Sequence, residues 1–230
     1  MIRDSFRLLG DVIFTARCDI CGEVISVGER RCADCLSAKR IEGKTCRYCG
    51  KPKSECKCSD SGYNKPRYNG IYAPYYYDGS IKNAVRRLKF SGYTELADTM
   101  GREIADTIRK RATTTFDIVT FVPISPKKKK RRGFNQAELI AQKVAAELGV
   151  PFVPTLNKII STDSQRTKSG RHRGGNVFGV YDLAKDVSVE SKIILVVDDV
   201  RTTGATLSEC TDMLKIYGAK AVYAASFAIR

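Results

Sequence analysis

Residues 193–206 read IILVVDDVRTTGAT, and this stretch decides the fold. The apolar run up to Val197 predicts a buried strand at the centre of a parallel sheet, because such strands are covered on both faces. Two acids follow where we expect the strand to stop, and a small, hydroxyl-rich loop leads into a helix over residues 206–217. Ligands of open α/β sheets bind beyond the carboxyl ends of the strands, so the sequence predicts a binding site here.

The loop after the acids has the features of a phosphate site. Gly204 and Ala205 keep it free of bulk, so that backbone N–H groups can wrap a phosphate. The helix that follows directs the positive end of its dipole toward the same place. Three hydroxyl donors complete the loop: Thr202, Thr203 and Thr206.

The two acids, Asp198 and Asp199, have a different task, because carboxylates and phosphate repel each other. They suit a sugar diol, from which they accept hydrogen bonds, or a magnesium-bound ligand. Carboxylates on the hydroxyls and amides on a terminal phosphate favour a phosphorylated ribose. The alternative is a strand, turn and helix in which the acids only cap the helix, but the pattern is longer than that alternative requires.

Strand-like and helix-like patterns alternate over residues 70–230, which predicts one α/β domain. Asn135 is a plausible N-cap, and Gly149 ends the helix that follows it. The expected strands are 71–77, 116–122, 152–155 and 221–229, and the other expected helices are 80–89 and 94–110.

Eight of the nine cysteines lie in close pairs between Cys18 and Cys58, and the segment has little apolar content. Residues 1–17 lack the pattern of a secretion signal, so we expect a cytoplasmic, reducing compartment, in which paired cysteines favour zinc over disulfides. So small a core hardly folds without metal, and four thiolates leave no open position, so the zinc is expected to be structural.

Three arrangements of the cysteine pairs remain open: sequential, interleaved, or a single occupied zinc site. Gly22 and Gly50 follow the second cysteine of their pairs, where a knuckle turn favours a positive φ. Cys210 is expected in the core. Sequential pairing places Cys18, Cys21, Cys32 and Cys35 on one ion and Cys46, Cys49, Cys56 and Cys58 on another.

Composition divides the chain into four parts. Residues 1–17 are predicted to form an amphipathic helix facing a partner surface, and residues 18–58 form the cysteine-rich module. Residues 59–69 have the composition of a linker before the α/β domain at 70–230. No apolar run is long enough to predict a membrane span.

The formal charge of +15 favours polyanions, and it concentrates in six consecutive cations, Lys127, Lys128, Lys129, Lys130, Arg131 and Arg132. Close like charges repel each other, so we expect an exposed, mobile loop. Three interpretations of this segment remain open. Arg131 or Arg132 closes on a pyrophosphate, the whole segment binds a nucleic-acid backbone, or the loop is merely solvated. Residues 164–176, with the single histidine His172, are a second basic stretch at the expected rim of the site.

Several motifs resemble those of a known family. The run 193–206 resembles the fingerprint of the phosphoribosyltransferase superfamily. Four further motifs resemble those of the ComF family: Tyr77-Asp78-Gly79, Leu88-Lys89-Phe90, Arg132-Gly133-Phe134-Asn135-Gln136 and Asn176-Val177-Phe178. Members of this family are competence-associated phosphoribosyltransferase-like proteins that carry an N-terminal double zinc ribbon.

The resemblance implies a type I phosphoribosyltransferase-like parallel sheet flanked by helices, and a site for phosphoribosyl pyrophosphate. Asp198 and Asp199 are then the catalytic acids that hold the ribose hydroxyls. The 5-phosphate residues are then Arg201, Thr202, Thr203, Gly204, Ala205 and Thr206. The pyrophosphate loop is expected at Pro123 and Ile124, with Lys89 as a second candidate.

The resemblance leaves two functions open. The chain either binds phosphoribosyl pyrophosphate and single-stranded DNA during DNA uptake in natural transformation, with a competence helicase as a possible partner, or it is an active phosphoribosyltransferase. The enzyme would transfer the pentosyl group to an amine or base, with magnesium assisting the departure of pyrophosphate.

Overall fold

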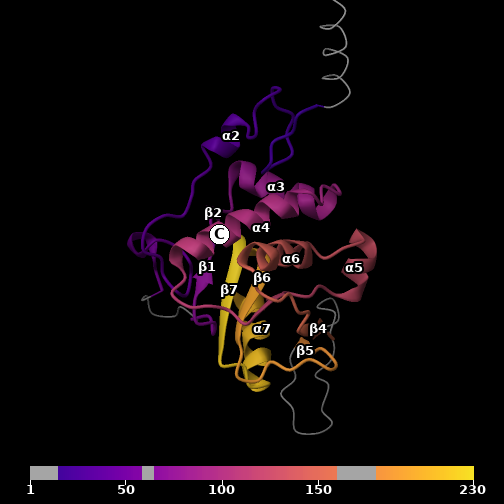
Figure 1. Ribbon diagram of the computed structural model, residues 1–230. Helices are drawn as coiled ribbons and strands as arrows, with labels where there is room; N and C mark the ends of the chain where they lie inside the picture. The colour runs from indigo at the N-terminus through magenta and orange to yellow at the C-terminus, as the bar shows by residue number, and fades with distance from the viewer. Residues whose placement is uncertain (1–14, 59–64, 160–179) are drawn as a thin grey trace, which may run out of the picture.

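A parallel sheet forms the centre of the computed structural model, which describes residues 15–58, 65–159 and 180–230 (Figure 1). Within these ranges the main sheet has five strands, all parallel, in the order β1-β7-β6-β3 with β2 also beside β7. The strands are β1 (Ile71–Tyr72), β2 (Tyr75–Tyr76), β3 (Ile118–Phe121), β6 (Ile193–Arg201) and β7 (Ala221–Ile229).

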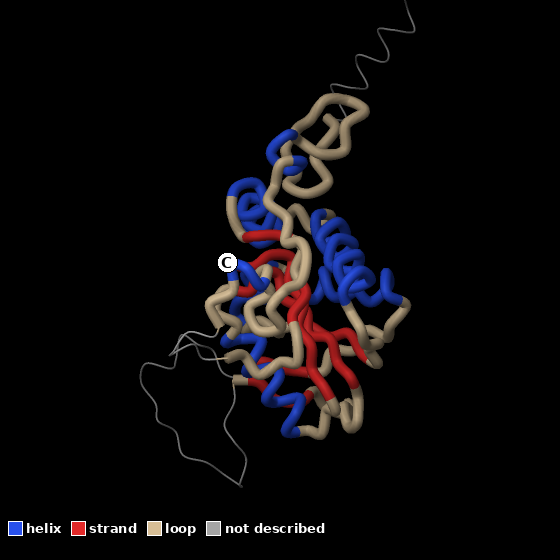
Figure 2. Tube along the Cα trace, turned by 90° about the vertical axis from the view of Figure 1, so that its left-hand side faces the viewer, coloured by secondary structure: helices blue, strands red, loops and turns tan. Residues whose placement is uncertain are grey.

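Helices cover both faces of this sheet (Figures 1 and 2). One face is covered by α4 (Leu96–Arg111) and α6 (Gln136–Leu148), with α3 (Gly79–Phe90) packed beside α4, while α7 (Ala205–Ile216) lies on the other face. The short helix α5 (Pro126–Arg132) follows β3, and an antiparallel pair, β4 (Leu156–Lys158) and β5 (Tyr181–Leu183), packs beside α7. The predicted fold class is confirmed.

Strand β6 is apolar on both faces because helices cover both faces of the sheet. Leu195 and Val197 lie in the core shared with α4 and α6, whereas Ile194 and Val196 lie in the core under α7. All four side chains are fully buried. A continuous apolar run is what a central strand between two helical layers requires.

Some element boundaries differ from those expected. The predicted strand 71–77 is divided into β1 and β2 around Pro74, which has no N–H for a sheet ladder. The expected strand 152–155 is reduced to one bridge between Phe152 and Val119, and β4 begins just after it. Residues 15–17 are not helical, because Arg17 forms a bridge with Val24, while residues 1–14 lie outside the described ranges.

The cysteine-rich module packs against the α/β domain at two places. Its first half, with α2 (Ala33–Leu36), contributes Cys18 and Ile20 to the core that contains Leu88 of α3. Arg87 of α3 donates a 2.8 Å hydrogen bond from Nη1 to the carbonyl of Cys21. The second half, with the short 3-10 helix η1 (Lys53–Glu55), lies near the start of the main sheet, where Gly50 approaches Ile71.

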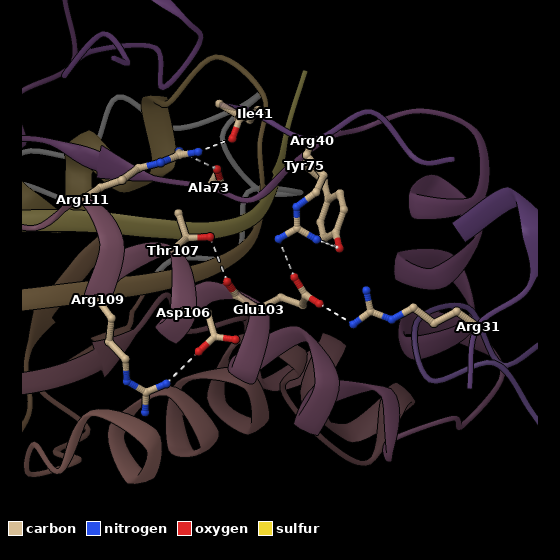
Figure 3. A network of polar contacts seen from close by, with 10 residues as sticks. All are labelled: Arg31, Arg40, Ile41, Ala73, Tyr75, Glu103, Asp106, Thr107, Arg109 and Arg111. Atoms are coloured by element: carbon tan, nitrogen blue, oxygen red, sulfur yellow. Dashed lines mark hydrogen bonds and ion pairs between the residues drawn. The ribbon is translucent and has the colours of Figure 1, made fainter. Parts of the chain in front are cut away.

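A buried acid on α4 joins the two parts (Figure 3). Glu103 pairs with Arg31 at 2.5 Å and with Arg40 at 2.8 Å, and both arginines come from the cysteine-rich module. Arg40 also stacks over the ring of Tyr75 in β2, with 4.6 Å to the centroid. On the same helix, Arg111 donates hydrogen bonds to the carbonyls of Ile41 and Ala73. The module is therefore fixed to α4 by hydrogen-bonded charges.

The part of the expected linker that the structure describes, residues 65–69, lies on the α/β domain. Tyr68 is buried in the core under α7. The N–H of Asn69 donates to the carbonyl of Val222 at 2.7 Å, which continues the line of β1 beside β7. Residues 59–64 lie outside the described ranges.

Candidate phosphoribosyl site and zinc centres

The sequence predicts that the strand stops before the two acids. In the structure, strand β6 instead continues through them to Arg201. The neighbouring β7 is long enough to pair with the extension, with Asp198 opposite Ser226 and Val200 opposite Ala228. Successive side chains of a strand point to opposite faces. Asp198 and Asp199 are therefore directed to different sides of the sheet, and the loop begins only at Thr202.

Asp199 lies on the α3 side and is buried. Its Oδ2 pairs with the ammonium group of Lys89, near the end of α3, and its Oδ1 accepts the N–H of Val200 at 2.9 Å. Lys89, predicted as a pyrophosphate ligand, is thus placed at the acids. The structure brings these two candidate residues together across about a hundred residues of chain.

Asp198 lies on the α7 side and is half-buried. Its Oδ1 accepts the N–H of Asp199 at 2.8 Å. Burial and the charge of Asp199 raise the pKa of Asp198 well above its usual range, against a smaller lowering by Lys89. Cys210 of α7 is buried as expected, and burial followed by the charge of Asp198 raises the pKa of its thiol. The two acids therefore occupy different electrostatic surroundings.

The loop itself is tight around Gly204, whose φ is +87°. A Cβ at this position would lie 3.2 Å from both Arg201 Nε and Tyr68 Oη. Arg201 is buried, and its Nη2 donates to the carbonyl of Thr203 at 3.1 Å. The N–H of Ala205 donates to Thr203 Oγ1 at 3.3 Å. The position therefore requires glycine both for its backbone angle and for space.

Helix α7 begins directly after Gly204, and no side chain of the cap residue closes it. The first-turn N–H groups of a helix have no partner within the helix, which makes this end an anion site. A cavity of about 490 Å³ opens beside the loop. It is lined by residues 65–67, residues 201–205, Ser208, Glu209 and Asp212. Asp198 and Thr206 line a second, smaller hollow that shares Arg201, Thr202, Gly204 and Ala205 with the first.

The loop after β3 lies next to the acids because β3 and β6 are parallel neighbours. The N–H of Val122 donates to the carbonyl of Val197 at 2.9 Å. Pro123 is buried and Ile124 is half-buried just beyond this bond. Asn135, the N-cap of α6, donates from Nδ2 to the carbonyl of Val122 at 3.0 Å and so fixes the far end of the loop.

The six cations form the helix α5, not the mobile loop expected from their charge. Ser125 caps the helix by accepting the N–H of Lys128, Pro126 occupies its first turn, and Gly133 ends it with a φ of +82°. Lysine and arginine are good helix formers, and cations are favourable in a last turn. The expected exposure is confirmed, because only Arg132 among the six is half-buried.

Arg132 links α5 to α3. Its guanidinium lies 5.0 Å from the centroid of the Phe90 ring, and its Nη1 donates to Gln136 Oε1 at 2.8 Å. The motif from Arg132 to Gln136 is thereby explained: an arginine held in place, a glycine that ends α5, and Asn135 starting α6. The sequence identifies Phe90 only as part of a motif, because the exposure of its ring depends on residues distant in the chain.

The eight module cysteines gather in two groups of four, in the sequential arrangement. Within each group all sulfur atoms lie within 4.8 Å of one another, and none of the eight cysteines forms a disulfide. The Cys21–Cys32 and Cys49–Cys56 sulfur distances of 3.6 and 3.8 Å match the ~3.8 Å edge of a tetrahedron with Zn–S bonds of about 2.3 Å. The residues fit zinc, and the interleaved arrangement is wrong.

Backbone geometry at the knuckles supports the same conclusion. Gly22 and Gly50 have positive φ angles of 72° and 77°, as expected. In each group the pKa of the first cysteine is lowered. Burial raises the pKa of Cys18, but hydrogen bonds from backbone N–H groups outweigh it and lower the pKa to about 7, and the pKa of Cys46 is lowered to about 7 in the same way.

Two sequence expectations fall outside the described residues. The basic stretch 164–176, His172 included, and the motif 176–178 lie within the undescribed range 160–179. Within the described part of the chain, no helix is long and apolar enough to cross a membrane.

Two family models match the chain. The model described as phosphoribosyl transferase domain matches residues 95–230, and the model described as double zinc ribbon domain matches residues 9–63. The first covers β3, β6, β7 and the loop after β6, and the second covers both cysteine groups. Together they agree with the resemblance to the ComF family that the sequence motifs indicate.

Curated relatives carry names that refer to DNA utilization or to competence. The chain is 28% identical to the DNA utilization protein YhgH of Escherichia coli K12, over 89% of this chain and 93% of the relative. It is 28% identical to the competence protein ComFC of Bacillus subtilis 168, over 78% of this chain and 75% of the relative. These matches extend across both parts of the chain.

Solved structures give weaker matches. The adenine phosphoribosyltransferase of Thermoanaerobacter pseudethanolicus aligns with a TM-score of 0.39 at 16% identity, over 61% of this chain and 83% of that one. An allosteric regulatory enzyme of purine biosynthesis aligns with a TM-score of 0.36 at 20% identity, over 58% of this chain but only 25% of that one.

Proposed function

We propose a function from one premise, namely that the chain belongs to the phosphoribosyl transferase domain family. It binds phosphoribosyl pyrophosphate, or a related nucleotide, at the loop after β6, and it acts in the cytoplasm on single-stranded DNA during DNA uptake. The name ComFC of one relative and the name YhgH, a DNA utilization protein, of another support the second part. A competence helicase is the expected protein partner.

The observation that carries the proposal is the glycine loop at the start of α7, where the cap residue Gly204 has no side chain to accept the first-turn N–H groups. Gly204 holds a backbone angle that presents the following N–H groups ahead of the helix, where its dipole favours an anion. The 5-phosphate binds there, with hydroxyl groups from Thr202, Thr203 and Thr206 and backbone amides of Arg201 and Ala205. Asp199 and Asp198 accept hydrogen bonds from the ribose hydroxyls.

Lys89 links the acids to the pyrophosphate part of the ligand in this proposal. Its ammonium group lies on Asp199 and balances one carboxylate next to the phosphate loop. The pyrophosphate oxygens of the ligand lie on the same side, between Lys89 and the loop of Pro123 and Ile124. Lys89 then interacts with both Asp199 and the pyrophosphate. A neutral side chain at position 89 has no charge to balance either of these anions.

Magnesium enters with the ligand in this proposal. Within the described residues, only the two cysteine groups bring together three or more side chains of metal-binding type. The acids of the site form no carboxylate cage of their own, so an ion would be held chiefly by the diphosphate, as is common for Mg²⁺. The chemistry that magnesium would supply there is the neutralisation of charge on the leaving pyrophosphate.

Calorimetry with phosphoribosyl pyrophosphate and Mg²⁺ tests the ligand. The wild type is expected to bind, and the double variant Asp198→Asn, Asp199→Asn to lose binding by at least tenfold, since each charged hydrogen bond contributes about 1.5–3 kcal/mol. Asp106→Asn, which replaces an exposed acid on α4 that pairs with Arg109, is the matched control and binds like the wild type. Equal binding by the double variant contradicts the proposal.

The DNA-binding part rests on α5. Its Lys127, Lys130 and Arg131 are exposed and have no acidic partner within the described residues, so they are free to meet phosphates. Replacing the six cations by glutamine is expected to weaken oligothymidylate binding and to flatten its salt dependence, by about 0.7 in slope for each lost phosphate contact. The double asparagine variant keeps its DNA affinity, because the two ligands occupy different surfaces.

A second candidate function is catalysis, favoured by the family model and by the juxtaposition of Lys89 and Asp199. The nitrogen of an amine or base forms a bond to the sugar carbon that bears the pyrophosphate, and the bond from that carbon to the pyrophosphate oxygen breaks. The pyrophosphate leaves with the electron pair of that bond, and the nitrogen releases a proton to water. Asp198 and Asp199 are the catalytic acids that orient the ribose. Pyrophosphate release with a panel of amines and bases is the test, and no release with any of them leaves binding as the function.

A further inference from the structure

Phe90 ends α3 with an exposed ring. It is 67% exposed, although its neighbour Lys89 points inward to the acids and Leu88 is fully buried. Among the described residues, the other large aromatic side chain with high exposure is Tyr217, whose hydroxyl donates to Asp182. An exposed phenyl ring has no such polar partner, so burial by a ligand is its main source of further stabilisation.

One face of the Phe90 ring already carries a cation. The guanidinium of Arg132 lies 5.0 Å from the ring centroid and is held by its hydrogen bond to Gln136. A ring fixed by a guanidinium on one side loses little freedom when a second flat group stacks on the other. We refer to Phe90, Arg132 and Arg86 together as the Phe90 platform.

A cavity of about 470 Å³ with a mostly polar lining has Phe90 and Arg86 of this platform in its wall, whereas Arg132 is not among its lining residues. Its wall contains no acid among the described residues. Arg87 in this wall is already bound to the carbonyl of Cys21, whereas the exposed Arg86 has no ion-pair partner in the described part of the chain. The lining residues are Asn83, Arg86, Arg87, Phe90 and Ser91.

We propose that the Phe90 platform stacks an unpaired base of single-stranded DNA, an inference that rests on the proposed DNA binding by α5. The base lies on the ring of Phe90, Arg86 meets a neighbouring phosphate, and the strand continues along the cations of α5 beyond Arg132. Stacked bases of a duplex have no free face, so the platform selects single strands, and it tolerates any base because each has a π-face.

The chain contains no tryptophan, so Phe90→Trp introduces a single fluorescent reporter at the platform. Oligothymidylate is expected to quench its emission on binding, because a stacked base contacts the indole directly. Ile216→Trp, at an exposed position on α7, is the matched control and keeps its emission when the same oligonucleotide binds.

Affinity gives the second readout. Phe90→Ala is expected to weaken oligothymidylate binding, measured by fluorescence anisotropy, by roughly tenfold or more, and Phe90→Trp to preserve it. An abasic oligonucleotide of equal length binds the wild type and Phe90→Ala equally, since it has no base to stack. Calorimetry with phosphoribosyl pyrophosphate is unchanged in Phe90→Ala, which shows that the variant is folded.

The outcomes separate the inference from the function on which it rests. If the wild type binds oligothymidylate but Phe90→Ala binds it equally, and the tryptophan is not quenched, the platform is overturned and DNA binding by α5 stands. If the wild type binds no single-stranded DNA at low salt, both are overturned. Equal affinity for duplex and single strands also overturns the platform, because a duplex offers no base to stack.

Discussion

Replacing Glu103 by glutamine tests how the cysteine-rich module is held on the α/β domain. Glu103 is buried and accepts from Arg31 at 2.5 Å and Arg40 at 2.8 Å. A hydrogen bond to a charged group contributes about 1.5–3 kcal/mol. The arginine side chains are 31% and 38% exposed, so solvent screens them and the two bonds are discounted. We therefore expect a loss of about 2 kcal/mol in the free energy of unfolding.

For a chain of this size, that loss lowers the melting temperature by about 4–8 °C, measured by differential scanning calorimetry of the zinc-loaded protein. Asp106→Asn is the matched control: Asp106 lies on the same helix and pairs with Arg109 at 2.7 Å, but both side chains are about half exposed. Such a surface pair contributes less than about 0.5 kcal/mol. Equal melting temperatures for the two variants refute the assignment of Glu103 as the main tie.

The pH dependence of this effect has a definite sign. Burial raises the pKa of Glu103, but the hydrogen bonds and charges of Arg40 and Arg31 outweigh burial, so the pKa lies below its usual 4.5. A carboxyl with a lowered pKa stabilises the fold fully above its unfolded value, and this contribution is lost as the pH falls through the folded value. The difference between wild type and Glu103→Gln is therefore constant near neutral pH and shrinks below about 4.5.

Three further predictions concern the zinc ions of the cysteine-rich module and the loop after β6. Chelation under reducing conditions is expected to release two zinc ions per chain and to expose residues 18–58 to protease, because the module has little other core; a metal content of one, measured by a chromogenic chelator, contradicts the two-site arrangement. Gly204→Ala and Gly218→Ala both force alanine into a positive φ, at 87° and 89°, and each is expected to lose roughly 1–2 kcal/mol in unfolding free energy. Only Gly204→Ala should also abolish phosphoribosyl pyrophosphate binding, measured by calorimetry. Tyr68→Phe removes the 2.6 Å hydrogen bond to the carbonyl of Tyr48 and is expected to lower stability by about 1 kcal/mol and to weaken the same ligand several-fold; unchanged affinity would show that the loop does not depend on this bond.

The local features of this fold could be predicted from the sequence. The apolar run of β6, the glycine loop and the paired cysteines each act over a few residues, and the structure has them where expected. The same holds for α6, whose cap Asn135 and terminal Gly149 are local signals. These elements depend on backbone conformation and spacing, which neighbouring residues determine.

The features that could not be predicted depend on distant partners. The extension of β6 through the acids follows from the length of β7, which pairs with it, and no residue near Asp198 signals it. The sequence predicts a loop where the structure has α5, because charge repulsion among the six cations favours a loop. Ser125, Pro126 and Gly133 at the ends of the segment favour the helix. Glu103 gave no local sign of its two arginine partners, which lie 63 and 72 residues earlier in the chain.

The contacts of Tyr68 argue that the cysteine-rich module belongs to the phosphate site and is not merely attached beside it. Tyr68 donates to the carbonyl of Tyr48, which lies between Cys46 and Cys49 in the second knuckle. The hydroxyl also faces the charge of Arg201, which acts to lower the pKa of Tyr68, but burial outweighs it and raises the pKa to about 12, so the hydroxyl stays a donor at physiological pH.

Gly204 lies directly against this pair, with space for no side chain between them. A knuckle conformation set by metal therefore positions Tyr68, Tyr68 positions Arg201, and Arg201 holds the carbonyl of Thr203 in the loop. Because the loop can present its N–H groups to a phosphate only in one backbone conformation, loss of zinc from the second cysteine group should weaken phosphate binding more than loss from the first.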